Sequence, residues 1–268
     1  MRKLPKNIIV GKPIRPNAGI TDRYAKALKA LVRQMCAQTE KEILKAYDQH
    51  WAFTQDASIA SQGRITVNRL DNTFGQLFGR KGNELANNMV RDTLTTSTKA
   101  LTNSVKDMSG GLQLNFENQS ARLKEMMKAA VNENVALIKS VQSQYHDGVR
   151  QAVMRSITTG EGRDAIVQHL NEKEGITLRR AENIAKDQTR KVYASVAREK
   201  SKSAGLNKYI WCHSSGGAHP REIHQDLDGQ VCDYNDPPIA DEDGTTANPG
   251  ELINCGCFAK PCIEIEEE

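Results

Sequence analysis

The chain has 268 residues, of which 38% are hydrophobic and only 5% aromatic, a composition typical of a helix-rich protein with much surface left for partners. It contains no uninterrupted apolar run of about 18 residues, which excludes a membrane-spanning helix. The N-terminal apolar run is limited to Ile8, Ile9 and Val10, which is too short for a signal peptide, so a cytoplasmic protein is expected.

The formal net charge of +4 hides an asymmetry between the two parts of the chain. Residues 211–268 carry 13 acidic and two basic side chains, so their net charge is −11, and residues 1–210 carry +15. Such a division predicts that the two parts face different neighbours, and the basic part favours nucleic acid or an acidic protein surface. Ordinary solvated helix faces explain the dispersed positive charges equally well.

Residues 1–20 form the first segment that the pattern distinguishes. Pro5, Pro13 and Pro16 stand among basic and small residues, which predicts an extended basic arm that is either loose or laid across a partner. Residues 21–130 follow as a helical region of unassigned type, with apolar residues recurring at helical spacing.

Two features within the helices require interpretation. Cys36 lies in the apolar stripe of the first helix and is interpreted as a small core residue. Gly75, Gly79 and Gly82 weaken the middle of the second helix and are candidate break points.

Residues 131–208 are predicted to be helical, with a sequence pattern that differs from that of the preceding helices. Short helices are expected to alternate with stops or turns at Gly160, Gly162 and Gly175. Thr177 is expected to cap a last long helix. Its outer faces carry the basic residues that we predict to contact DNA or a partner: Arg179, Arg180, Lys186, Arg190, Lys191 and Arg198.

Residues 209–262 change to short strands and loops, followed by an acidic tail at 263–268. Strands are predicted at 208–212, 229–234, 253–258 and 262–265. So small a unit with few large apolar residues often needs a metal or a larger neighbour for stability. The fold class is therefore α+β, with long helices before a small C-terminal strand-and-loop unit. The predicted structural residues are Trp211 as its largest core side chain, Arg221, Asp228, and Gly229 and Gly250 at turns needing positive φ.

Five of the six cysteines lie between Cys212 and Cys262, which marks this unit as a candidate metal site. In an extended segment, Cys255 and Cys257 point to the same side and can present two thiolates to one ion. His224 is the natural third ligand for a structural zinc ion, which prefers four Cys or His ligands. The fourth ligand is expected to be Cys232, with His219 as the alternative.

Two other interpretations of the cluster stay open. In the first, no metal binds, Arg221 and His224 hydrogen-bond to acidic neighbours, and the cysteines pack as small apolar groups. In the second, the unit is a metal-dependent hydrolase or nuclease. That activity would use the following residues: His213, His219, His224, Asp226 and Asp228. The absence of an H-E-x-x-H-type motif weighs against it, and we expect a protein that is not an enzyme.

The region from Glu133 to Cys257 resembles the phage Mu F-like head morphogenesis family, also called minor capsid proteins. The resemblance rests on the order of several motifs: a "VALIKS" helix, a "TLRRAENIAKDQT" helix, a strand led by Trp211, the pattern R-x-x-H-x-x-L-D-G, and a terminal C-x-C. Family members commonly carry C-x-x-C where this chain has Arg221 and His224. Because arginine cannot bind zinc, this departure removes one ligand from the family's pattern.

The resemblance implies a minor capsid protein incorporated in low copy into the procapsid, in the head interior or at the portal vertex. Its expected partners are the portal protein, the major capsid protein and double-stranded DNA bound without sequence specificity. It would support head assembly and genome packaging or delivery, and would be present in the host cytoplasm during assembly. A DNA-binding module without an assembly role is a further alternative.

Overall fold

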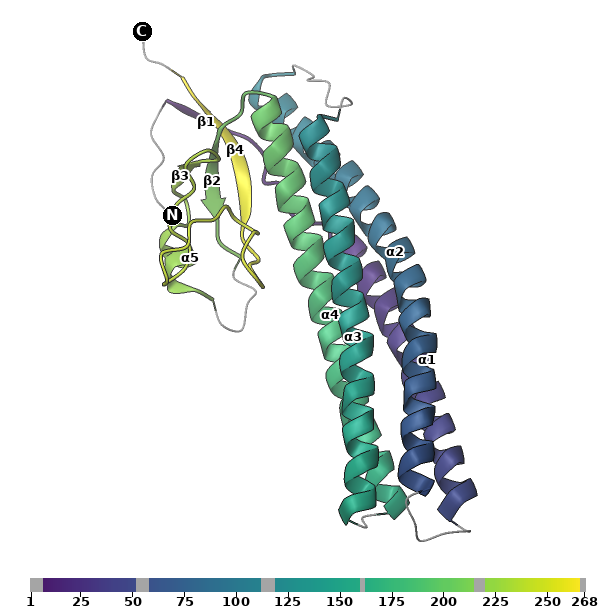
Figure 1. The fold of residues 1–268 in the computed structure, drawn as a ribbon. Helices are drawn as coiled ribbons and strands as arrows, with labels where there is room; N and C mark the ends of the chain where they lie inside the picture. The colour runs from purple at the N-terminus through teal and green to yellow at the C-terminus, as the bar shows by residue number, and fades with distance from the viewer. Residues whose placement is uncertain (1–6, 52–57, 112–118, 160–161, 215–219, 266–268) are drawn as a thin grey trace. The chain divides into compact units, whose positions relative to one another are not determined.

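The computed structural model describes residues 7–51, 58–111, 119–159, 162–214 and 220–265 (Figure 1). They confirm an α+β fold in which long helices precede a small antiparallel sheet unit. The helices are α1 (Ala18–Trp51), α2 (Ser58–Met108), α3 (Ala121–Thr159), α4 (Gly162–Ser203) and α5 (Glu222–Asp226). The strands are β1 (Ile8–Val10), β2 (Lys208–Cys212), β3 (Val231–Asp233) and β4 (Phe258–Glu264). No helix in the described residues combines the length and apolar character needed to cross a membrane.

The chain divides into two compact units, and all four long helices contribute residues to both. The helical unit comprises Asp22–Asn87 and Val131–Ala185. The mixed unit comprises Met1–Thr21, Asn88–Ala130 and Lys186–Glu268. The domain boundaries predicted from the sequence near residues 20, 130 and 262 remain predictions.

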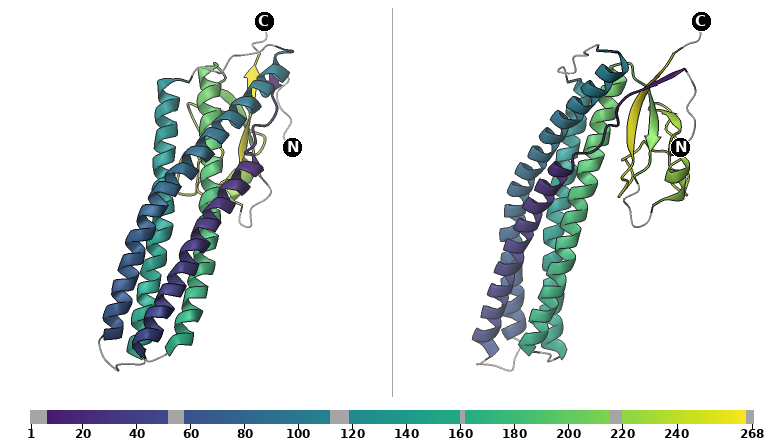
Figure 2. Two further views of the ribbon diagram at one scale, coloured as in Figure 1. Left: turned by 90° about the vertical axis from the view of Figure 1, so that its right-hand side faces the viewer. Right: turned by 180° about the vertical axis from the view of Figure 1, so that it is seen from behind.

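The helical unit packs segments of α1, α2, α3 and α4 side by side (Figure 2). Consecutive helices run in opposite directions (Figure 2). Arg69 on α2 forms an ion pair with Glu42 on α1. Apolar side chains at helical spacing, among them Val32, Met35 and Ile138, are buried in its core. This burial is why the periodic stripes form helices. Cys36 is buried as predicted, and burial raises the pKa of its thiol to about 12.

The predicted break at Gly75, Gly79 and Gly82 is wrong, because α2 continues through all three. A Cβ atom on Gly82 would lie 3.1 Å from Cγ2 of Ile138 on α3. This glycine therefore allows close approach of two helices, and the packing outweighs its low helix propensity of about 1 kcal/mol.

The predicted stop at Gly175 and cap at Thr177 are also wrong, since both lie inside α4. The Thr177 hydroxyl donates to the Lys173 carbonyl 2.6 Å away, one turn earlier, which is the bond of a threonine inside a helix. Gly162 begins α4, and Gly160 lies outside the described residues.

A buried polar cluster lies within the helical unit around His146, whose side chain is fully buried. Gln142 donates through Nε2 to His146 Nδ1 at 2.7 Å and to Asp71 Oδ1 at 2.6 Å. Thr39 Oγ1 lies 3.4 Å from the other ring nitrogen. Desolvation lowers the pKa of His146 to about 4, so the ring is neutral at pH 7.

The mixed unit contains an antiparallel sheet with the strand order β1-β4-β2-β3 (Figure 1). The strands predicted at 208–212 and 229–234 are confirmed as β2 and β3. One strand, β4, replaces the two predicted at 253–258 and 262–265. Tyr209 and Trp211 project into a buried cluster with Leu227, Tyr234 and Ala259, and Trp211 is fully buried as predicted.

The described part of the N-terminal arm lies on the sheet of its own chain. Ile9 of β1 pairs with Ile263 of β4, which extends the sheet by one strand. Ile14 is buried and donates its N–H to the Ala259 carbonyl at 2.9 Å. Beside it, the Arg15 guanidinium stacks on the Phe258 ring at 4.5 Å. The arm is therefore a structural part of the mixed unit.

Candidate metal centre

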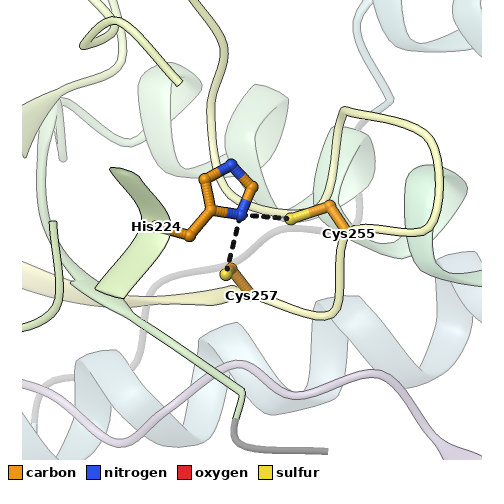
Figure 3. A group of neighbouring side chains, drawn as sticks. All are labelled: His224, Cys255 and Cys257. Atoms are coloured by element: carbon orange, nitrogen blue, oxygen red, sulfur yellow. Dashed lines mark hydrogen bonds between the residues drawn. The ribbon is translucent and has the colours of Figure 1, made fainter. Parts of the chain in front are cut away.

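His224, Cys255 and Cys257 meet in the interior of the mixed unit (Figure 3). His224 projects from α5, and the two cysteines come from the segment that leads into β4. Their exposed fractions are 3%, 3% and 4%, and the Trp211 ring packs 5.2 Å from the imidazole. The structure thus brings together the three ligands that the sequence analysis placed first.

The distances within this trio fit one tetrahedral zinc ion. His224 Nδ1 lies 3.7 Å from Cys255 Sγ and 3.5 Å from Cys257 Sγ. With Zn–S near 2.3 Å and Zn–N near 2.0 Å, tetrahedral angles separate nitrogen and sulfur ligands by about 3.5 Å. The donor atoms all lie within 4.8 Å of one another. Side-chain type, burial and spacing therefore suit a zinc ion, with three protein ligands.

A backbone carbonyl orients the imidazole of His224. Its Nε2 lies 2.9 Å from the oxygen of Ala240 and donates to it, while Nδ1 faces the two sulfur atoms. Metal-binding histidines are commonly held by such a bond from the second ring nitrogen. The orientation of the ring therefore suits coordination through Nδ1.

The two thiols interact strongly with each other. Their shared hydrogen bond lowers the pKa of Cys255 and raises that of Cys257, because the remaining proton stabilises the first thiolate. The N–H of Gly250 also donates to Cys255 Sγ at 3.4 Å. Burial instead raises the pKa of Cys232 and of Cys262 to about 11. The pairing thus favours the thiolate form of Cys255, whereas burial favours the neutral thiols of Cys232 and Cys262.

The segment carrying Cys255 is held in a turn instead of the predicted strand. Asn254 has φ of 59° and donates its N–H to Asp187 Oδ1 of α4 at 2.7 Å. Gly250 has φ of 87°, and a Cβ there would lie 2.9 Å from the Ala194 Cβ. Gly229 likewise has φ of 78°, so both predicted positive-φ glycines are confirmed. The turn and the helix α4 together place the two sulfur atoms.

Other predicted site residues lie apart from the trio. Cys232 is on β3 opposite Tyr209, and its thiol contacts the Gln230 carbonyl at 3.8 Å. It does not join the only group of metal-ligand type in the described residues. His219 lies outside the described residues. Asp228 accepts a hydrogen bond from the backbone N–H of His213 at 2.8 Å, which is a structural contact.

The basic residues predicted to contact DNA or a partner have mixed surroundings. Arg179 and Lys186 are exposed on α4. Arg198 is half-buried, forms an ion pair with Glu251, and has its pKa lowered by burial. The remaining three are Arg180, which donates to Ser140, Lys191, which pairs with Asp187, and Arg190, whose guanidinium approaches Gly256. Part of the predicted basic surface is thus engaged within the chain.

Sequence reasoning missed two residues that position the centre, Asp187 and Ala240. Asp187 belongs to a helix 67 positions before Asn254, and Ala240 acts through its backbone oxygen. No motif marks either contact. The one available signal was Asn254 itself, because asparagine adopts positive φ more readily than most residues.

The comparisons with known proteins support the resemblance. Residues 147–260 match the family described as Phage Mu protein F like protein, so this region is Mu F-like. A Haemophilus influenzae (strain Rd) protein described as uncharacterized is 25% identical over 257 residues, covering 96% of this chain and 56% of the relative. The chain thus spans about half the length of that curated relative. No solved structure matches the chain.

The matched region contains α4, the sheet strands β2 and β3, and all three residues of the metal-type group. Residues 147–260 are thus similar to the Phage Mu protein F like family, and the remaining residues lie outside that match.

Proposed function

We propose that this protein is incorporated in low copy into the phage procapsid, where it associates with the portal or the inner capsid surface. The Mu F-like match over residues 147–260 is the observation that carries this proposal. In this role the protein supports head assembly and genome packaging or delivery. Its contribution is structural and involves no catalytic turnover.

Contact with packaged DNA forms a second part of the proposal. Residues 1–210 carry a net charge of +15, and phosphate contacts give sequence-independent affinity that falls as salt rises. Arg179 and Lys186 are the exposed members of the predicted set on α4. Arg198 is left out of the proposed DNA contact, because its guanidinium pairs with Glu251 within the mixed unit.

Zinc binding at His224, Cys255 and Cys257 is the third part of the proposal. A bound zinc ion would cross-link α5 to the segment preceding β4 and stabilise a unit with a small apolar core. His224 would supply Nδ1 as a ligand, and the buried cysteines would supply sulfur ligands. The chemistry of such a site is structural.

Purified particles test the assembly role. Mature phage and procapsids are separated, their proteins are quantified by mass spectrometry, and the chain is located relative to the portal vertex by labelling. We expect a few copies per particle near the vertex or inner surface, and loss of normal heads when the gene is silenced. Absence from both particle types together with normal heads would overturn the proposal.

A further inference from the structure

The helix α5 connects to its surroundings through two side chains one turn apart. Arg221 immediately precedes α5 with φ of −68° and ψ of 131°, and it makes no side-chain cap bond to the helix. A guanidinium only donates hydrogen bonds, so it cannot cap helix N–H groups and binds acceptors elsewhere. His224 follows three residues later, within the helix.

The two side chains bind the same pair of loops. At residues 240–241, His224 donates to the Ala240 oxygen and Arg221 Nε lies 3.5 Å from Asp241 Oδ2. At residues 253–257, both terminal nitrogens of Arg221 lie 3.3 Å from the Ile253 oxygen, and His224 contacts the two thiols. We call these paired contacts the α5 clamp.

The position of Arg221 also bears on the number of metal ligands. Structural zinc sites usually have four protein ligands, and two of them are often separated by two residues. In the described residues, the group contains only His224, Cys255 and Cys257. The residue at the right spacing before His224 is Arg221, whose guanidinium is positively charged and cannot coordinate a metal.

We infer that Arg221 takes the place of a fourth protein ligand and ties α5 to the cysteine-bearing loop by hydrogen bonds instead of a metal bond. This inference deepens the zinc proposal and assigns Arg221 as a positioning residue. It has two consequences. Metal at this centre has three protein ligands among the described residues and is held less tightly than by four, and the α5 clamp keeps the unit folded after the metal leaves.

Three variants of the full chain test the inference: Arg221→Cys, Arg221→Ala and the control Arg163→Ala. Arg163 pairs with the Asp48 carboxylate and belongs to the helical unit, whereas the metal-type group belongs to the mixed unit. Zinc affinity is measured by competition with a chromophoric chelator. Co²⁺ replaces Zn²⁺ for absorption spectra, and thermal melting is followed with and without chelator.

Arg221→Cys should bind zinc at least about tenfold more tightly than wild type and show a stronger Co²⁺–thiolate band. Chelator should lower its melting temperature by more than it lowers that of the wild type, whose site holds zinc less tightly. Metal-free Arg221→Ala should melt about 3 °C below metal-free wild type, and Arg163→Ala should not.

Equal zinc affinity in wild type and Arg221→Cys would refute the assignment of the fourth position. Equal melting of metal-free wild type and Arg221→Ala would refute the α5 clamp. Failure of wild type to bind zinc would overturn the zinc proposal and the assignment of the fourth position, whereas the melting of the metal-free proteins tests the clamp independently. Failure to assemble heads would bear only on the assembly role.

Discussion

Protonation of His146 provides a quantitative test of packing in the helical unit. Gln142 donates to Nδ1 of His146 and to Asp71, so both of its amide hydrogens have acceptors and the ring carries its proton on Nε2. Adding a proton to Nδ1 would place two donors 2.7 Å apart in a fully buried site. Asp71 and Asp147 favour the charged ring and Arg150 opposes it, but desolvation is the largest effect.

The expected loss of stability follows from the pKa of about 4 in the folded chain and the ordinary value of 6.5. Because the folded-state pKa is depressed, the unfolded chain binds more protons between these values. The stabilisation by neutral His146 is therefore fully present above pH 6.5 and is lost as the pH falls toward 4. At about 1.4 kcal/mol for each pKa unit, the loss approaches 3 kcal/mol at pH 4.

Urea denaturation of wild type and His146→Leu from about pH 7.5 to pH 4 measures this loss. The difference in free energy of unfolding between the two proteins cancels the titration of carboxylates common to both. Relative to the variant, wild type should lose about 3 kcal/mol over this range. Parallel curves for the two proteins would refute the assignment of a buried neutral His146.

Three further predictions concern the mixed unit. Gly250→Ala should lower the free energy of unfolding, measured by urea denaturation, by about 3 kcal/mol. The causes are the strained positive φ and the close contact of the new Cβ with Ala194. A loss of less than about 1 kcal/mol would contradict that geometry. Ile14→Ala should cost about 3 kcal/mol in the same assay, because the arm buries this side chain, whereas a loose arm predicts no change. Untreated wild type should contain about one zinc per chain by elemental mass spectrometry, and Cys255→Ser should contain less than a tenth of that. Cys212→Ser, which changes another buried cysteine, is the matched control. Zinc-free wild type would contradict the proposal.

The sequence predicted the helices well where apolar residues alone decide the structure. The stripe containing Val32 and Met35 is buried, as its spacing required. The position of Gly82 was misassigned, because a glycine that permits close packing looks the same in sequence as one that ends a helix. Only the neighbouring helix, for example Ile138 beside Gly82, distinguishes the two cases.

The candidate site was predictable only in part, where the residues are close together in the sequence. Cys255 and Cys257 are two residues apart, so their proximity depends little on long-range structure. No strand includes the two cysteines, since β4 begins at Phe258, and a turn with positive φ at Asn254 precedes them. Contacts such as Asp187 to Asn254 join distant segments through one backbone N–H, which leaves no pattern in either segment.

The charge asymmetry acquires a second explanation from the mixed unit. Its acidic residues were predicted to face a neighbour different from that of the basic helices. Two of them instead pair with basic residues of the same unit, Glu251 with Arg198 and Glu264 with Lys208. Part of the opposite charge therefore serves to join the C-terminal segment to α4 and β2. A DNA contact must then rely on exposed cations such as Arg179, whose neutralisation should weaken binding more than that of Arg198.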